Sequence, residues 1–167
     1  MIKKALGWSM DRHFPIFLEK NIFFRKLFLL RKLVFTKKVR PFYSQFGEDI
    51  AIGNFLNIKN KGFYVDVGCY HPIKYNNTYK LYKKGWEGIN IDLDAIKIEA
   101  FNFIRPRDHN ITAVVSDISH SVDIYSFGFY SLLSTIDKAS ADRYQGEGGK
   151  VLVRKVKTRS LTDIIEN

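Results

Sequence analysis

Hydrophobic and polar positions are most regularly ordered between residues 62 and 93, GFYVDVGCYHPIKYNNTYKLYKKGWEGINIDL. An aromatic and β-branched run at 62–68 predicts a buried strand, and a polar turn follows it. A short helix is then expected to end at Gly85, before a second strand at 87–93. Strand, helix and strand in this order predict a βαβ unit of a parallel sheet, and therefore an α/β fold.

The same patterns predict further elements on both sides of this unit. Ser44 and Asp94 are the expected N-caps of two helices, which run to about Asn57 and about Ile104. The remaining predicted elements are strands at 110–116, 121–127 and 151–157, and a helix that begins with Ser160 as its N-cap. Residues 145–150, QGEGGK, are predicted to form a loop without a phosphate site, because no strand precedes them and no helix opens directly after them.

Acidic residues stand at the ends of the two strands of the βαβ unit. Asp66 and Gly68 end the first strand, and Asp92 ends the second, 26 positions after Asp66. In open α/β sheets, ligands bind outside the carboxyl ends of the strands, where a carboxylate can accept hydrogen bonds from both hydroxyls of a ribose. Gly68 allows the backbone to approach a ligand closely. The pattern predicts a site for a nucleoside-containing cofactor, and the alternative for Asp92 is a solvated strand end.

The residues after Gly68 narrow the choice of cofactor. A dinucleotide site needs the spacing G-x-G-x-x-G, so that a pyrophosphate can lie on a helix N-terminus. Here Gly68 is followed by Cys69, Tyr70, His71 and Pro72, and the second and third glycines are absent. S-adenosylmethionine, which carries no phosphate, fits this sequence better than a dinucleotide.

The polar turn itself offers further site residues. Asn76, Asn77 and Thr78 place donors and acceptors where the cofactor or its substrate would pass, although Asn77 or Thr78 would also suit the cap of the next helix. His71 is a candidate general base, because its ordinary pKa lies close to neutrality. The alternative for His71 is a structural or solvated role in the loop.

Five segments together resemble the FkbM-type methyltransferases, bacterial S-adenosylmethionine-dependent enzymes with a class I Rossmann-like fold. These segments are YSQFGEDIAI, VDVGCYHP, YNNTYKLYKKGWEGINIDLD, RPRDHN and AVVSD, and the resemblance extends from Tyr43 to the C-terminus. It implies a Rossmann-like three-layer αβα architecture with a mostly parallel sheet. It also implies transfer of a methyl group to an oxygen, with a hydroxyl of a sugar or another polar metabolite as the acceptor.

The resemblance adds residues to the expected cofactor site. It implies that Asp117 accepts the adenine amino hydrogens with Ser116 beside it, and that Gln45 lies in a segment next to the cofactor. Cys69 and Leu93, the neighbours of Gly68 and Asp92, complete the expected contacts. The alternative for Ser116 and Asp117 is a turn-forming pair, and the alternative for Gln45 is the chemistry of a helix start. No metal site is expected.

The position of the C-terminus relative to this fold predicts an incomplete sheet. In the resembling fold the first strand is central and the fourth strand lies beside it, and the helix at Ser160 would lead into that fourth strand. The first strand is therefore expected to have an unpaired edge, which would favour self-association or aggregation. An incomplete sheet also argues against methyltransferase activity of this short chain alone.

Charge divides the sequence into two parts. Residues 1–41 contain 11 Lys and Arg against 2 Asp and Glu, whereas residues 42–167 contain 16 against 15. We therefore assign 1–41 to a basic, hydrophobic extension and 42–167 to the N-terminal portion of a methyltransferase domain. The single Cys69 excludes an intramolecular disulfide and fits a reducing, cytoplasmic location.

The extension suggests contact with an anionic membrane surface. Its apolar runs fall short of the about 18 residues that span a bilayer, and they do not form a signal peptide. A helix lying on the inner face of the membrane is one interpretation, although the basic residues of 14–39 fall all round a helix. A basic helix packed on the domain is the other, and nucleic acid is a weaker third. Two further functional hypotheses follow: a non-catalytic truncated paralogue that binds a membrane or partner chain through 1–41, and a nucleic-acid methyltransferase.

Overall fold

The computed structural model describes residues 21–34, 41–56, 61–117, 119–128, 134–146 and 151–166. The chain divides into two compact units, one formed by Phe28–Ala113 and the other by Met1–Leu27 together with Val114–Asn167. The helix α2 (Ile22–Val34) is continuous across the boundary between them. None of the helices in the described ranges has the length and apolar character needed to cross a bilayer.

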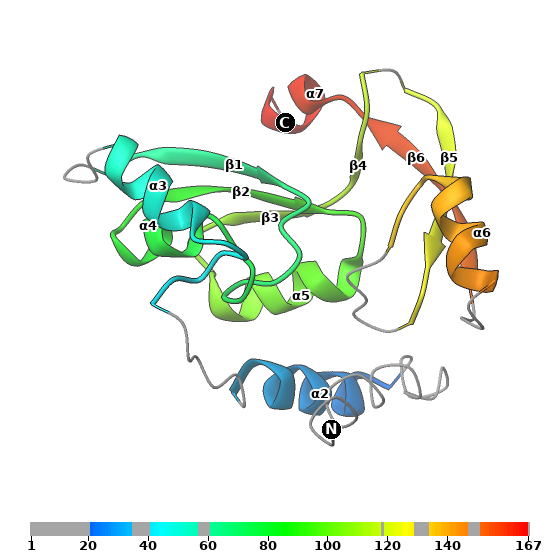
Figure 1. Ribbon diagram of the computed structural model, residues 1–167, viewed down its shortest axis with the longest axis horizontal. Helices are drawn as coiled ribbons and strands as arrows, with labels where there is room; N and C mark the ends of the chain where they lie inside the picture. Colours follow the sequence, from blue (N-terminus) through cyan, green and yellow to red (C-terminus); the bar gives the residue numbers. More distant parts are fainter. Residues whose placement is uncertain are drawn as a thin grey trace. The chain divides into compact units, whose positions relative to one another are not determined.

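The unit Phe28–Ala113 contains a parallel sheet of three strands in the order β1-β2-β3 (Figure 1). The strands are β1 (Phe63–Val67), β2 (Glu87–Asp92) and β3 (His109–Thr112), and the helices are α3 (Glu48–Phe55), α4 (Tyr79–Lys83) and α5 (Ala95–Ile104). Helix α4 connects β1 to β2, and α5 connects β2 to β3 and lies against both of those strands. The predicted βαβ unit and the α/β class are confirmed.

The two faces of this sheet differ in chemistry because successive side chains of a strand point to opposite sides. In the parallel register Asp66 lies beside Asn90, and Asn90 lies beside Asn110, so one face carries a row of polar side chains. On the other face Val65 lies beside Ile89. A buried polar row needs hydrogen-bond partners, and these partners define the candidate site below.

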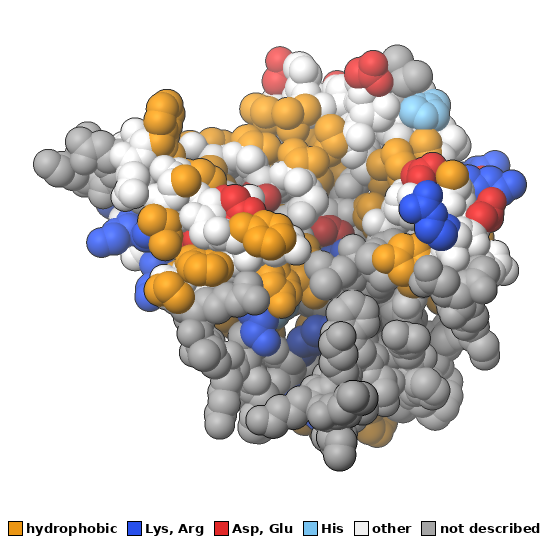
Figure 2. All heavy atoms as spheres, viewed as in Figure 1, with side chains coloured by type: hydrophobic (Ala, Val, Ile, Leu, Met, Phe, Trp, Pro, Cys, Tyr) orange, Lys and Arg blue, Asp and Glu red, His pale blue; other side chains and the backbone are white. Residues whose placement is uncertain are grey.

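Strand β1 lies at the edge of the described sheet. It pairs with β2 and with no other described strand, and Phe63, Val65 and Val67 are exposed. Hydrophobic side chains also gather over α3 and α4 (Figure 2), and Phe46 and Phe55 are exposed by 81% and 89%. This unit therefore exposes several large apolar side chains to its surroundings.

The second unit contains a mixed three-stranded sheet in the order β4-β6-β5. Its strands are β4 (Val114–Val115), β5 (Ser121–Ser126) and β6 (Leu152–Arg159), and its helices are α6 (Lys138–Gly146) and α7 (Leu161–Glu166). Strand β6 pairs in parallel with β4 and antiparallel with β5. The backbone N–H of Asp163 donates to Ser160 Oγ at 3.0 Å, which confirms Ser160 as the cap of α7.

Two predicted elements are corrected by the structure. The strand expected at 110–116 is split at Ala113. The N–H of Ala113 still donates to the backbone carbonyl oxygen of Asp92 in the first sheet, whereas β4, which follows directly, belongs to the second sheet. The strand-like sequence of 110–116 does not reveal that the chain changes sheets. Helix α3 begins at Glu48 with Gly47 as its N-cap, and Ser44 instead bonds from outside the helix to the N–H groups of Gly47 and Asp49.

The predicted loop at 145–150 also needs correction. Gln145 and Gly146 are the last residues of α6, and 147–150 lie outside the described residues. Helix α3 ends at Phe55, and Asn57, its predicted end, is likewise outside the described residues. The remaining predicted boundaries agree with the observed ones to within one or two residues.

Candidate cofactor site at the carboxyl end of the parallel sheet

Asp92, the predicted ribose ligand, is held rigidly at the end of β2. Its Oδ2 accepts the backbone N–H of Tyr70 at 3.0 Å, and its Oδ1 accepts the backbone N–H of Asp94 at the same distance. Lys97 Nζ lies 3.4 Å from Oδ1, and both side chains are buried. The carboxylate is therefore oriented by two backbone groups, and its charge is balanced by one ammonium group.

The turn after β1 crosses the end of β2. The N–H groups of Gly68 and Cys69 both donate to the carbonyl oxygen of Ile91, at 2.8 and 3.1 Å. Gly68 has a φ of +77°, which an L side chain rarely adopts, and a Cβ at this position would meet no atom within 4 Å. The backbone of Gly68 therefore borders open space at the carboxyl end of the sheet.

Asp66 is a half-buried acid whose hydrogen-bond partners are neutral, and the charge of the buried Arg105 guanidinium also acts on it. Its Oδ2 accepts Thr78 Oγ1–H at 2.8 Å and Asn76 Nδ2–H at 3.2 Å. Burial raises the pKa of the Asp66 carboxyl above its ordinary value, against the opposing effects of these hydrogen bonds and of the Arg105 charge. A carboxylate in such a position would gain from a cationic group of a ligand, because the gain would offset its lost hydration.

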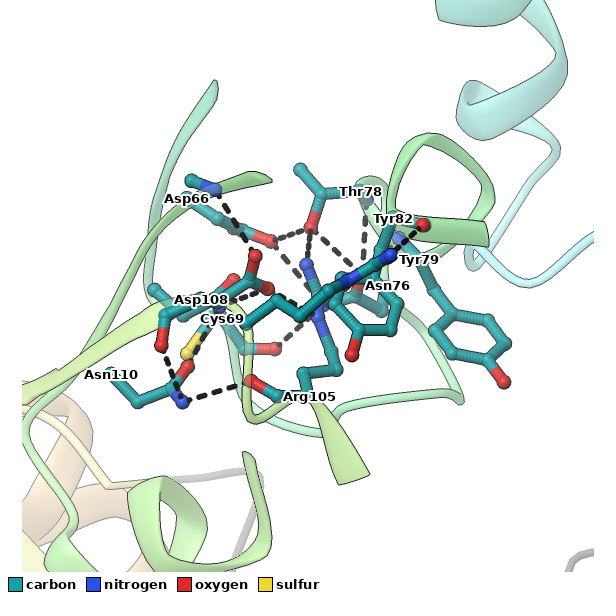
Figure 3. Close-up of polar contacts among 12 residues, drawn as sticks. Asp66, Cys69, Asn76, Thr78, Tyr79, Tyr82, Arg105, Asp108 and Asn110 are labelled. Atoms are coloured by element: carbon teal, nitrogen blue, oxygen red, sulfur yellow. Dashed lines mark hydrogen bonds and ion pairs between the residues drawn. The ribbon is translucent and has the colours of Figure 1, made fainter. Parts of the chain in front are cut away.

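Asn76, the first of the three polar residues of the turn, organises it in the structure. Its Oδ1 accepts the N–H groups of Thr78 and Tyr79 at 3.0 and 2.7 Å, and its Nδ2 donates to the carbonyl of Cys69 at 3.2 Å. Asn76 therefore caps α4 and joins that cap to the turn after β1 (Figure 3). Asn77 is exposed, while Thr78 occupies the N-cap position without a side-chain cap bond and bonds to Asp66 instead.

Arg105 is the centre of the buried polar network, and its side chain is fully buried. It donates from Nε to Asp108 at 2.8 Å, from Nη1 to Asn76 at 3.0 Å, and from Nη2 to Tyr64 Oη at 2.5 Å and Thr78 Oγ1 at 3.0 Å (Figure 3). The guanidinium group thus connects the end of α5 to β1 and to the start of α4.

Asp108 completes the network from the strand side. Its carboxylate accepts the Tyr64 hydroxyl, the N–H of Gly88 at 3.1 Å and Asn90 Nδ2–H at 2.8 Å. Burial raises the pKa of the Tyr64 hydroxyl, which therefore remains protonated and donates to Asp108. The segment RPRDHN contains both charged partners, but its sequence alone does not show that Arg105 and Asp108 are buried together.

His71 has a geometry that does not suit a general base. It is buried, and its Nδ1 accepts the backbone N–H groups of Ile73 and Lys74, both at 3.0 Å. In this tautomer the proton lies on Nε2, so neither nitrogen has a lone pair available to take a proton. Burial, with smaller effects from Lys74 and Lys32, lowers the pKa of His71 to about 3. The observed contacts make His71 a residue that shapes the turn.

A neutral buried His71 predicts that stability falls as the pH is lowered. Between the ordinary pKa of 6.5 and the folded-state value of about 3, the unfolded chain binds more protons than the folded chain. His71 should then lower the free energy of unfolding by up to about 1.4 kcal/mol per pH unit below pH ~6.5. Urea unfolding at about pH 7 and about pH 5 measures this slope.

The matched variant for this prediction is His71→Gln, whose amide oxygen can accept the same backbone hydrogens but does not titrate. The raised pKa of Asp66 contributes to pH dependence with the opposite sign, and it is common to both proteins. The variant should therefore show a smaller loss of stability on acidification. Equal slopes in the two proteins would show that His71 does not change its protonation on unfolding.

Cys69 and Leu93 lie beside the two site carboxylates in the chain. The Cys69 thiol packs with Ile98 and Phe101 in the core, and burial raises its pKa. Any contact of Cys69 with a ligand would therefore come from its backbone. Leu93 is half-buried between Asp92 and Asp94. Cys69 and Leu93 therefore both lie at the carboxyl edge of the sheet, and the Cys69 side chain packs in the core.

The other predicted contacts are less closely connected to this edge. Gln45 is exposed, but its segment reaches the turn, because the N–H of Asn76 donates to the carbonyl of Tyr43 at 3.3 Å. Ser116 and Asp117 follow β4 in the second compact unit, where Ser116 Oγ donates to Asp117 at 3.2 Å. The structure therefore brings together Asp66, Gly68, Thr78 and Asp92 within one unit, and it assigns the expected adenine ligands to the other unit.

Comparisons of the chain with protein-family models, curated proteins and solved structures find no match. Within the described ranges no group of three or more His, Cys, Asp or Glu side chains is arranged to hold a metal ion. The chemistry of the carboxyl edge is therefore the main indication of function.

Proposed function

We propose that this protein is an S-adenosylmethionine-dependent methyltransferase of the FkbM type, with a three-layer class I fold. In this proposal it methylates a hydroxyl group of a sugar or another polar metabolite. The observation that carries the proposal is the convergence of Asp66, the open backbone of Gly68 and the oriented carboxylate of Asp92 at one edge of a parallel sheet. Ligands of open α/β sheets bind at this edge.

The residues present fit an adenosine-containing cofactor, but Asp92 has few acceptor positions left for a ribose hydroxyl. A carboxylate has about four lone-pair positions, and Asp92 already receives Tyr70 N–H, Asp94 N–H and Lys97 Nζ. A ribose hydroxyl would therefore use the remaining position or replace the Lys97 ammonium. The open space beside Gly68 leaves room for the approach of a ligand to the backbone.

Each residue has a defined task in this proposal. Asp92 would accept a ribose hydroxyl, and Asp66 would accept the amino group of the methionine portion. Asn76 and Thr78 would hold Asp66 in place. The bound cofactor supplies an activated methyl group on its sulfonium sulfur, so the protein's contribution is to position the acceptor and exclude water.

Thermal unfolding with different nucleosides tests this proposal. S-adenosylhomocysteine at about 100 times its Kd should add about 2.7 kcal/mol to the free energy of unfolding, by mass action. NAD at the same concentration should add nothing, because the turn lacks a pyrophosphate cradle. Identical melting curves with and without S-adenosylhomocysteine, or stabilisation by NAD alone, would contradict the proposed cofactor.

A further inference from the structure

Helix α2 has an apolar stripe that is separate from the face it buries. Phe23, Leu27 and Leu30 follow one another at intervals of four and three residues and therefore share a face of the helix. Their side chains are exposed by 68%, 52% and 46%. Leu29 and Leu33, in contrast, are buried. The stripe therefore lies largely exposed and is separate from the side of α2 that carries Leu29 and Leu33.

The exposed basic residues of α2 lie on either side of the stripe. At 100° per residue, Lys26 and Arg31 stand roughly 70° from its centre in opposite directions, and both are exposed. Lys32 is half-buried, with its Nζ 5.6 Å from the centre of the Phe28 ring. The helix contains no acidic residue. The exposed side of α2 therefore combines the apolar stripe with two cationic side chains beside it, and Ile22 and Phe24 add exposed apolar surface beyond them.

We propose that α2 binds the surface of an anionic lipid bilayer. Phe23, Leu27 and Leu30 would enter the boundary between headgroups and acyl chains, and Lys26 and Arg31 would contact lipid phosphates or carboxylates. Apolar insertion combined with cationic flanks is the arrangement by which helices lie in a membrane interface. This proposal does not depend on the cofactor proposed above.

Charge favours this occupant over a second copy or a nucleic acid. Two copies that met through the stripe would bring the cationic borders Lys26 and Arg31 together without acidic partners on α2. A nucleic acid would be attracted by the charge and could stack only on Phe23, so that Leu27 and Leu30 would contribute little to its binding. A bilayer with anionic headgroups satisfies both features.

Vesicle co-sedimentation of the full chain tests the inference. The protein should bind mixed phosphatidylcholine–phosphatidylserine vesicles, and binding should weaken as salt is raised, while pure phosphatidylcholine vesicles should retain little protein. Equal retention by the two kinds of vesicle would overturn the electrostatic part of the proposal. Retention by neither would overturn the proposal as a whole.

Matched variants separate the stripe from general hydrophobicity. The double variant Phe23→Ser/Leu27→Ser should bind the mixed vesicles at least about ten-fold more weakly, because two inserted side chains are lost. Phe46→Ser/Phe55→Ser removes side chains that are exposed by 81% and 89% but lie outside α2, and it should leave binding unchanged. A larger loss from the second pair would assign the membrane contact to α3 and refute the proposal.

A second pair of variants separates local charge from net charge. Lys26→Glu/Arg31→Glu should weaken binding by about five-fold for each positive charge removed. Lys155→Glu/Lys157→Glu changes net charge equally at exposed positions of β6 and should have a much smaller effect. Equal effects would contradict a specific role for α2. Sedimentation-equilibrium masses provide an independent readout, and a dimer that is lost in Phe23→Ser/Leu27→Ser without vesicle binding would identify a second copy as the occupant.

Discussion

Replacing Arg105 by methionine is expected to lower the free energy of unfolding by about 3–5 kcal/mol. The guanidinium group donates to Asp108, Asn76, Tyr64 and Thr78 in a fully buried position. Methionine fills much of the volume but leaves the Asp108 carboxylate buried without its cationic partner. Breaking a buried pair on one side is costly, because the remaining charge has lost both water and its partner. Urea unfolding monitored by circular dichroism measures the loss.

Arg107→Met is the matched control for this prediction. Arg107 is exposed, donates to the carbonyl of Tyr82 at 2.7 Å and lies over the Tyr82 ring at 4.3 Å. An exposed arginine with these contacts should contribute no more than about 1 kcal/mol. Similar losses from the two substitutions would mean that burial of Arg105 is not what makes it important.

Asp92→Ala is expected to weaken binding of S-adenosylhomocysteine by roughly 10- to 100-fold. The substitution removes the acceptor proposed for the ribose, and charged hydrogen bonds contribute about 1.5–3 kcal/mol each. It also removes the acceptor for Tyr70 N–H and the nearer partner of Lys97, so that the turn after β1 loses its anchor. Calorimetric titration of the folded variant measures the change in Kd.

The control for Asp92 is the neighbouring carboxylate Asp94. Its Oδ2 lies 3.7 Å from Lys97 Nζ, and its side chain makes no capping hydrogen bond to α5. Asp94→Ala should therefore change the affinity by less than about three-fold, within the range of a partly exposed ion pair. Loss of binding in Asp94→Ala with normal binding in Asp92→Ala would move the proposed ribose contact to Asp94.

The elements that were predicted well are those in which local pattern and tertiary environment agree. The run from Phe63 to Val67, the glycine at position 85 and the second run from Glu87 to Asp92 each carry a strand or cap signal within a few residues. Their parallel pairing follows from the helix between them. The positions of Asp66, Gly68 and Asp92 at one sheet edge could therefore be inferred from sequence alone.

The buried polar network could not be inferred in the same way. Tyr64 and Asp108 are 44 residues apart, and Arg105 bonds to residues 27 to 41 positions earlier. No local periodicity links such residues, and an arginine in a charged loop segment is usually solvated. The cap of α4 was expected at Asn77 or Thr78 and is made by Asn76, because three consecutive polar residues offer several equivalent caps and only the fold selects one.

The break at Ala113 is a case in which tertiary structure overrides local preference. The stretch from Ile111 to Val115 has the composition of one strand, yet it serves two sheets. Residues with high β-propensity fit either sheet, so their pattern predicts extended structure but not the partner strand. The position of the expected adenine ligands Ser116 and Asp117 in the second compact unit follows from this change of sheet.

Calorimetric titration of S-adenosylhomocysteine into the full chain tests the central claim most directly. The proposal predicts saturable heat from the wild-type protein, and no comparable heat when NAD is the titrant. Cooperative urea unfolding of the same preparation confirms that the sample is folded. A cooperatively folded protein that gives no heat with S-adenosylhomocysteine would contradict the assignment of the Asp66–Gly68–Asp92 edge as a cofactor site.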